Sequence, residues 1–376
     1  MKKIYVKAST CLSSLGETKE QTWQAIQEGK SGIKKIEQLG FIENIYAGQI
    51  SDEVIEQAWN KLGYTVSFTR LEKMLSIVLA PLIAKQQPTA NDILVLASTK
   101  GNIAALADAG ATEADLNIMI QRIADLFGFS TKPIIVCNAC VSGILAVSVA
   151  KRMMQMEQCQ SAYIIAGDEL TPFVVSGFNS FQAMSSEPCK PFDSNRSGVS
   201  LGEATAAVLL STEADEETNF EIVGEAAIAD ANHISGPSRI GEGLYLSIQN
   251  AMKEANITAS QIDLVSAHGT ATNYNDEMES IAFDRCGLAT VPTHSLKGYF
   301  GHTLGAAGLL EQVMVMESML HNTLIVSKGF EHLGVSRPLN IITASEKQPI
   351  RFALKTASGF GGSNTALLIA KIKETV

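Results

Sequence analysis

Short β-rich runs alternate with longer helical patterns along most of the 376-residue chain. Such an alternation predicts a mixed α/β protein, because strands and helices then pack on one another in layers. The predicted strands are residues 4–7, 93–97, 133–136, 162–166, 206–210, 220–228, 264–267, 291–295, 350–356 and 365–372. The predicted helices include residues 19–28, 71–85, 142–156, 243–254 and 306–321.

The series of strands restarts near Thr218, after the acidic turn at 213–217. Each half then places a turn of small and polar residues before a Gly/Ala-rich apolar helix, CNACVSG in the first half and GHTLGAAG in the second. A pattern that recurs in this way indicates duplication. No Pro- or Gly/Ser-rich linker separates the halves, so we expect residues 1–217 and 218–376 to be two similar halves of one packed unit.

Composition and charge exclude several classes of protein. Ten more acidic than basic residues give a net charge of −10, which argues against a nucleic-acid partner. No apolar stretch approaches the ~18–20 residues of a membrane span, and Lys7 interrupts the N-terminal apolar run, unlike a signal peptide. Six scattered cysteines form no disulfide framework, so we expect a protein of the cytoplasm, which is a reducing compartment.

Cys140 lies between a short apolar strand and an apolar helix. Unpaired N–H groups and the positive end of the helix dipole at such a turn favour a thiolate and can stabilise an oxyanion, as in a nucleophile elbow. The alternative is a buried structural cysteine. Cys137 and Cys140 could also form a redox pair or half a zinc site, but the absence of a second C-x-x-C disfavours both.

Two histidines stand in similar positions, each in a polar or Gly-rich turn that follows a predicted strand. His268 precedes the run GTATNYNDEME, and His302 follows Lys297 in a turn whose glycines, Gly301 and Gly305, indicate a close approach by a ligand or by main chain. Either histidine could instead be a satisfied core residue. The run TASGFGGSN at 356–364 predicts a tight or mobile turn, and a plain β-hairpin fits it as well. No Lys-Ser/Thr follows its glycines, so a phosphate-binding Walker loop is disfavoured.

Together these segments resemble the elongating β-ketoacyl-ACP synthases, the condensing enzymes of fatty-acid and polyketide synthesis, and the likeness runs nearly end to end. The similar segments are WQAIQEGKSGI (23–33), NACVSG (138–143), KPFDSNRSGVSLGEA (190–204), AHGTATNYNDEME (267–279), SLKGYFGHTLGAAGLLE (295–311) and SGFGGSN (358–364). The resemblance assigns the nucleophile to Cys140, the catalytic histidines to His268 and His302, and the site lysine to Lys297. Supporting positions fall on Glu279, Thr270 and Thr272.

The resemblance implies a thiolase-like fold of two similar α/β halves in five layers, αβαβα. It also implies a decarboxylative Claisen condensation, in which Cys140 holds an acyl group from acyl-ACP and malonyl-ACP extends it. His268 and His302 would donate hydrogen bonds to the malonyl thioester carbonyl, and Lys297, paired with Glu279, would orient the site. The N–H groups of Cys140 and Phe360 would form an oxyanion hole, with Gly359 and Gly361 beside Phe360 in a gating loop.

The resemblance requires no metal and no organic cofactor, because the phosphopantetheine arm belongs to the acyl carrier protein. The expected partners are that carrier protein, acyl and malonyl thioesters, and a second chain, in a homodimer or in a heterodimer with a related ketosynthase or chain-length-factor-like subunit. Thiolases carry Cys-His-Cys and initiating ketoacyl synthases Cys-His-Asn, whereas this chain has Cys-His-His, which favours elongation.

The chain also departs from the family pattern. It is somewhat short, and its segment 100–132 before the nucleophile is shorter than the cap region that family members usually have there. Ser358 stands where a Phe is common in the family, and Lys190 stands where an Arg is common. These departures indicate a specialised lipid, polyene or polyketide pathway. The alternatives are a non-elongating scaffold or chain-length-factor-like subunit, and a thiolase-like CoA-dependent acyltransferase. Candidate basic residues for docking an acidic carrier are Lys34, Lys35, Lys132, Lys190 and Arg196.

Overall fold

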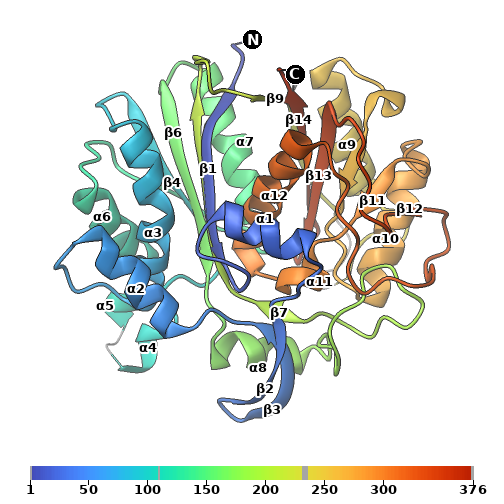
Figure 1. The fold of residues 1–376 in the computed structure, drawn as a ribbon, viewed down its shortest axis with the longest axis horizontal. Coiled ribbons are helices and arrows are strands. Elements are labelled where there is room, and N and C mark those ends of the chain that lie inside the picture. Colours follow the sequence, from blue (N-terminus) through green and yellow to red (C-terminus); the bar gives the residue numbers. More distant parts are fainter. Residues whose placement is uncertain (1, 109–110, 231–235, 374–376) are drawn as a thin grey trace.

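The computed structural model describes residues 2–108, 111–230 and 236–373, and its centre is an 11-stranded mixed sheet (Figure 1). The strand order is β12-β11-β10-β13-β14-β9-β1-β8-β6-β4-β5. These strands are β1 (Tyr5–Ser13), β4 (Asp92–Ala97), β5 (Ile134–Val136), β6 (Ser161–Asp168), β8 (Ala204–Ser211), β9 (Phe220–Ala229), β10 (Leu264–Ser266), β11 (Pro292–His294), β12 (Asn340–Ile341), β13 (Phe352–Gly359) and β14 (Ser363–Lys371). A small second sheet joins β2 (Ile33–Leu39), β3 (Ile42–Gly48) and β7 (Leu201–Gly202).

The large sheet contains the same five-strand arrangement twice. In the order β5-β4-β6-β8-β1, the first two pairings are parallel and the last two antiparallel. The order β11-β10-β13-β14-β9 repeats this pattern of directions pairing by pairing. The two sets meet where β1 pairs with β9, so they form one continuous sheet. The first set ends at Ser211 and the second begins at Phe220. The boundary between 217 and 218 stays a prediction.

Helices cover both faces of the sheet, and Figure 1 shows α7 and α12 between its two sets of strands, with α2, α3 and α6 on one outer side and α9 and α10 on the other. The helices are α1 (Lys19–Gln27), α2 (Asp52–Leu62), α3 (Arg70–Lys85), α4 (Ala105–Asp108), α5 (Ala111–Ala114), α6 (Leu116–Leu126), α7 (Ser142–Gln155), α8 (Pro172–Ser180), α9 (Glu242–Ala255), α10 (Asn273–Arg285), α11 (Lys297–Phe300) and α12 (Ala307–His321). The resulting layers run αβαβα, as expected.

Three large apolar cores lie between the layers, one central and two outer, and alternate residues of one strand enter different cores. On β6, Ile164 belongs to the central core with α7 and α12, whereas Tyr163 and Ile165 belong to the outer core with α2, α3 and α6. The far core packs α9 and α10 against the second set of strands. Strands buried on both faces carry near-continuous apolar runs, which is why the sequence marks them clearly.

Glycines let the two central helices lie very close together. A Cβ on Gly143 of α7 would lie 2.8 Å from the main-chain nitrogen of Leu309, and one on Gly308 of α12 would lie 2.7 Å from Cγ1 of Ile144. Side chains cannot occupy these points without displacement, so the contact requires glycine at both. This contact brings together the helices that follow CNACVSG and GHTLGAAG.

The ten strands predicted from the sequence are all present, with shifted ends. The strand predicted at residues 4–7 is longer than expected, because β1 continues past Lys7 to Ser13. The strand accommodates Lys7 because its ammonium pairs with Asp215 at 3.1 Å. The last two strands extend into the turn, so that Ser358 and Gly359 belong to β13. The sequence analysis did not identify the hairpin β2–β3, β7, or helices α2, α6 and α8. Among the described residues, no helix has the length and apolarity needed to cross a membrane.

Candidate active site

Cys140 lies in a strained turn between β5 and α7. The strand ends at Val136 and the helix begins at Ser142. Ala139 has φ of 44°, a left-handed conformation that is unfavourable for a residue with a Cβ. The strain turns the chain sharply enough to aim Cys140 away from the sheet, and the Cys140 side chain is buried. The local structure is therefore the elbow that the sequence predicts.

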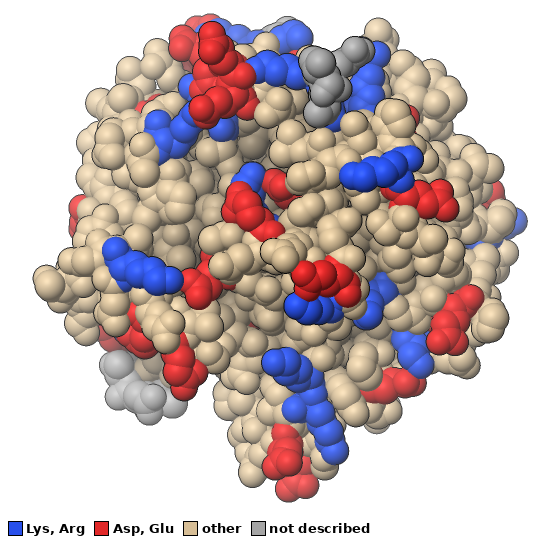
Figure 2. Space-filling view, in the orientation of Figure 1, with Lys and Arg blue, Asp and Glu red and all other residues tan. Residues whose placement is uncertain are grey.

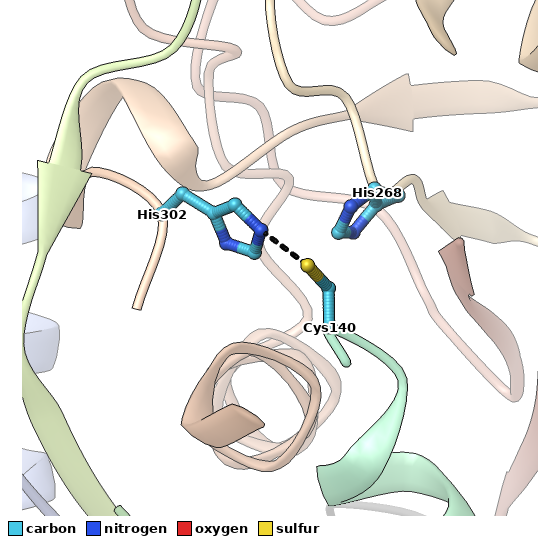
Figure 3. A group of neighbouring side chains, drawn as sticks. All are labelled: Cys140, His268 and His302. Atoms are coloured by element: carbon cyan, nitrogen blue, oxygen red, sulfur yellow. Dashed lines mark hydrogen bonds between the residues drawn. The ribbon is translucent and has the colours of Figure 1, made fainter. Parts of the chain in front are cut away.

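Two imidazoles converge on the sulfur of Cys140. Figure 3 shows His268 and His302 arriving from separate loops and pointing toward Cys140. Nε2 of His302 lies 2.9 Å from Sγ of Cys140, and the two imidazole rings are edge to face with centroids 5.2 Å apart. His268 follows β10 and His302 follows α11, so groups from both halves of the chain meet in one place.

Burial sets the protonation of all three groups. It raises the pKa of the Cys140 thiol to about 11, against the opposing effect of the Lys297 ammonium. Burial also holds the pKa of His268 and of His302 well below the usual 6.5, and Lys297 and Lys355 add to this depression. The resting site thus contains a thiol beside two neutral imidazoles at neutral pH. The favourable effect of a helix start on a thiolate is outweighed here by desolvation.

Lys297 holds the first of these imidazoles through its main chain and its ring. Its Nζ donates to the carbonyl of His268 at 2.6 Å and lies 3.3 Å from Nδ1 of the same residue. An ammonium has no lone pair to accept with, so it faces an unprotonated Nδ1 and leaves the ring proton on Nε2. Nε2 of His268 is then a hydrogen-bond donor.

The expected pairing of Lys297 with Glu279 is wrong. Lys297 pairs with Glu311 on α12, with Nζ 2.8 Å from Oε1. Glu279 instead accepts the main-chain N–H groups of His268 and Gly269, at 2.8 and 2.6 Å. Burial, followed by the nearby Asp276, raises the pKa of Glu279 to about 7. Glu279 therefore fixes the loop that carries His268, and it does so through hydrogen bonds that do not require a lysine.

Sequence reasoning missed Lys355 on β13. Its side chain is fully buried, and its Nζ lies 2.6 Å from Oε2 of Glu311. The available signal was a single lysine inside the apolar run of a buried strand, where a charge needs a specific partner. Glu311, at the end of the quoted segment 295–311, was also not singled out.

The β13–β14 turn forms the other wall of the site. The ring of Phe360 stacks on Phe178 with centroids 6.0 Å apart and meets Phe181 edge to face at 5.5 Å. A Cβ on Gly359 would lie 3.1 Å from the main-chain nitrogen of Cys140, and Gly361 has φ of 86°. The glycines thus allow the turn to lie against the elbow. Within the described part of the chain, the N–H groups of Cys140 and Phe360 donate to no other residue.

A cavity of about 360 Å³ connects these groups. One side is aromatic, with Phe178, Phe181 and Phe360, and the other is polar, with Thr270 and Thr272. The hydroxyls of these two threonines lie 2.8 Å apart, and the N–H of Thr270 donates to Asp276 at 2.9 Å. Every site residue expected from the sequence lines this cavity or contacts a residue that does.

Two other uses of the cysteines were considered. The sulfur of Cys140 and ring nitrogens of His268 and His302 lie within 4.8 Å of one another, close enough to hold a metal ion. A metal there would bind the sulfur of Cys140 and block its attack on a thioester. The expectation that the reaction needs no metal stays a prediction. Cys137 and Cys140 are both free thiols, and Cys137 is exposed while Cys140 is buried. Nothing in this arrangement favours a redox pair.

Basic and acidic side chains are interspersed over the face seen in Figure 2, and they lie side by side on the β2–β3 hairpin at the bottom of the view. Lys34 and Lys35 on β2 and Lys132 before β5 are exposed. Lys190 pairs with Glu187 at 2.9 Å. Arg196 is not available for docking, because its side chain is only 7% exposed and donates to the carbonyls of Asp193 and Gly334. The prediction that Arg196 contacts the carrier protein was therefore wrong, because its guanidinium is used to donate hydrogen bonds to main-chain oxygens inside the protein.

Two protein-family models match the chain. The model described as the β-ketoacyl synthase N-terminal domain matches residues 46–216, and that described as the β-ketoacyl synthase C-terminal domain matches residues 219–331. Among curated proteins, the chain is 25% identical to a 3-oxoacyl-[acyl-carrier-protein] synthase 2 of Vibrio harveyi, over 99% of each.

Solved structures share the fold over the whole chain. A β-ketoacyl synthase from Burkholderia phymatum has a TM-score of 0.85 at 21% identity, over 99% of this chain and 100% of that one. A chain in the structure of a Xenorhabdus doucetiae ketosynthase in complex with its chain length factor has a TM-score of 0.84 at 21% identity, over 98% of both. At these identities the likeness establishes the fold, which is the thiolase-like one expected.

Proposed function

The chain belongs to the β-ketoacyl synthase family, and from this premise we propose that it is a β-ketoacyl-[acyl carrier protein] synthase. It joins an acyl group held on Cys140 to the two-carbon unit of malonyl-ACP, in fatty-acid or polyketide chain elongation. The observation that carries this proposal is the convergence of one thiol and two neutral imidazoles, Cys140, His268 and His302, in a single cavity. This set supports an elongating enzyme, because each group has a distinct part in the two half-reactions.

In the first half-reaction, Sγ of Cys140 attacks the thioester carbonyl of acyl-ACP. The thiol proton passes to Nε2 of His302, which lies 2.9 Å away, and then to the departing thiol of the carrier arm. A carbon–sulfur bond forms to Cys140 as the bond to the carrier sulfur breaks. The N–H groups of Cys140 and Phe360 receive the negative oxygen that develops between these steps.

In the second half-reaction, malonyl-ACP enters the vacated space. His302 is left with a bare Nε2 once it has protonated the carrier thiolate, so its ring proton first moves from Nδ1 to Nε2. Nε2–H of His268, fixed by Lys297, and Nε2–H of His302 then donate to the malonyl thioester carbonyl. The electron pair of the bond to the leaving CO2 passes into an enolate that these donors stabilise. The enolate carbon attacks the acyl carbonyl on Cys140, a carbon–carbon bond forms, and the cysteine sulfur departs. No metal or organic cofactor takes part in this scheme.

The polar wall supports a place for the carrier arm. We propose that Thr270 and Thr272 hydrogen-bond the amide groups of the phosphopantetheine that the acyl carrier protein brings. The aromatic wall, with Phe360 as the movable part, would close over the loaded acyl group. Exposed Lys34, Lys35 and Lys132 remain candidates for contact with the acidic carrier.

We also propose that the chain works beside a second one, either a copy of itself or a related chain-length-factor-like subunit. β5 is one of the two edge strands of the large sheet and lies shortly before Cys140, so an edge-to-edge contact there would support the elbow. The six cysteines are free thiols, which supports a reducing compartment, and we propose the cytosol.

Intact-protein mass spectrometry tests the proposed function. Incubation with acyl-ACP should add one acyl mass to Cys140, and later addition of malonyl-ACP should remove it and release a 3-oxoacyl-ACP two carbons longer. Loading without extension would point to an acyltransferase that uses another acceptor, such as acetyl-CoA. A protein that gains no acyl mass would be a scaffold, and the proposal would be wrong.

A further inference from the structure

Two buried lysines contact the same carboxylate beneath the site. Nζ of Lys297 lies 2.8 Å from one oxygen of Glu311, and Nζ of Lys355 lies 2.6 Å from the other. The side chains of both lysines are 0% exposed and that of Glu311 is 2% exposed. The contact cluster thus has two cations and one anion, an excess positive charge that water does not screen.

Lys355 also binds the main chain that leads to His268. Its Nζ donates to the carbonyls of Ser266 and Ala267, each at 3.2 Å, and to the carbonyl of Thr356 at 2.7 Å. The carbonyl of His268 itself binds Lys297. Three successive carbonyls therefore face ammonium groups, while the N–H groups of His268 and Gly269 face the carboxylate of Glu279.

We propose that Lys355 is a positioning residue of the condensation site, which fixes the peptide that carries His268 and whose charge adds to the burial that keeps both imidazoles neutral. The inference rests on the proposed function, because neutral Nε2–H groups are the donors that the enolate needs. It adds a second lysine to the one that the family resemblance identifies.

The charges around the imidazoles support this role. The titratable and charged groups near His268 and His302 include Cys140 after β5, Asp168 on β6, Asp230 after β9, Asp276 and Glu279 on α10, His294 on β11, Lys297 on α11, Glu311 on α12 and Lys355 on β13. Removing Lys355 leaves Lys297 and Glu311 as a neutral pair. A proton on either ring then meets no uncompensated cation in the cluster, so the imidazoles take it up more readily.

The test is Lys355→Met, which keeps length and removes charge, with Lys151→Met as the matched control. Lys151 is a third buried lysine, 1% exposed, and it pairs with Glu254 away from the site. Titration of 13C-labelled histidine rings by NMR should show protonation of His268 or His302 at a pH about one unit higher in Lys355→Met than in wild type. Lys151→Met should titrate as wild type does. This readout needs no substrate.

Activity supplies the second readout. Decarboxylation of malonyl-ACP should fall about tenfold or more in Lys355→Met, because the donors are misplaced or protonated, while acyl loading of Cys140 changes less than about twofold. A folded Lys355→Met protein with wild-type ring titration and wild-type decarboxylation would overturn the proposal. If Lys355→Met does not fold, Lys355→Gln, which retains a hydrogen-bond donor without the charge, should still raise the pH of ring protonation. If wild type neither loads nor decarboxylates, the proposed function fails, and the ring titration still decides the role of Lys355.

Discussion

His302 is placed to exchange a proton with Cys140, since its Nε2 lies 2.9 Å from the sulfur. The thiol has a pKa near 11 and the imidazole is neutral. A cysteine that is not already a thiolate needs a base at the moment of attack, and His302 is the neighbour that can serve. Once Cys140 carries an acyl group, a shift of the ring proton from Nδ1 to Nε2 lets His302 donate, so one side chain contributes to both half-reactions.

Replacing the nucleophile should abolish the covalent step. We expect Cys140→Ala to show no acyl adduct and no condensation product, because no other thiol lies in the cavity lining. Mass spectrometry after incubation with acyl-ACP measures this. Cys137→Ala is the control, since Cys137 is exposed and three residues earlier, and it should load normally. An acyl adduct on Cys140→Ala would contradict the assignment.

The two histidines should separate the half-reactions. His268→Asn removes the donor that Lys297 orients, so malonyl-ACP decarboxylation should fall by about 10²–10³-fold. Loading of Cys140 should be affected far less, because His268 is not the ring at hydrogen-bond distance from the sulfur. Parallel assays of loading and of CO2 release test this. Equal losses in both would show that His268 acts on the nucleophile instead.

The reactivity of Cys140 should depend steeply on pH. Its pKa of about 11 means that the thiolate is a minor form at neutral pH, and its fraction grows about tenfold per pH unit below that value. Alkylation by iodoacetamide, followed in a Cys137→Ala background, should therefore rise continuously from pH 7 to pH 10. Lys297→Met should slow it at every pH, because Lys297 lowers the pKa of the thiol. A plateau reached near pH 7 would mean that Cys140 is already ionised.

The aromatic wall should protect the loaded enzyme from water. Phe360→Ala removes the ring that stacks on Phe178 and meets Phe181 edge to face, so water should reach the thioester and the acyl-Cys140 adduct should decay several-fold faster. Mass spectrometry over time gives the half-life. Phe173→Ala, at an exposed phenylalanine on α8, should leave the half-life unchanged. An unchanged half-life in Phe360→Ala would remove the gating role.

The free energy of unfolding should fall in mild acid, because His294 is a buried neutral imidazole. Burial lowers the pKa of His294 from 6.5 to about 4. Below pH 6.5 the unfolded chain binds a proton at this residue and the folded chain does not, so the stability that it contributes is lost as pH falls toward 4. The loss between pH 7 and 5 is roughly 2 kcal/mol. Denaturant unfolding at pH 7 and pH 5 measures this. Between these pH values His294→Gln should lose less of its free energy of unfolding than wild type does, by about 2 kcal/mol, and equal losses in the two proteins would contradict the prediction.

The predictable and unpredictable parts of the site differ in physical kind. Cys140 and His268 follow strand ends and His302 follows the short helix α11, each in a turn of small or polar residues, which is a local signal that sequence carries. Either Glu279 or Glu311 could pair with Lys297 as far as the sequence shows. Which of them does so depends on how α10 and α12 pack in the fold, and the sequence does not carry that information locally. Lys355 was hidden because one polar residue in an apolar strand looks like ordinary alternation.

The same distinction holds for the fold. Strands buried on both faces, such as β6 and β8, are apolar over most of their length and were found within a few residues. The hairpin β2–β3 is mostly exposed, with Lys34, Lys35 and Glu37 on its first strand, and a charged run does not indicate a strand. Helix α2 is capped by Ser51 and closed by Gly63, with φ of 74°, and those local signals were available but not used.

The first strand of the sheet has consequences for how the chain is made. β1 leaves the ribosome well before its partners β8 and β9, which lie about two hundred residues later, as the pairs Tyr5 with Ser211 and Tyr5 with Glu221 show. During synthesis the apolar residues of β1 stay without their sheet until more than half of the chain has emerged. Pairing over such separations is slow, so folding should be slow and prone to aggregation at high expression, and a lower temperature or more chaperone should raise the yield.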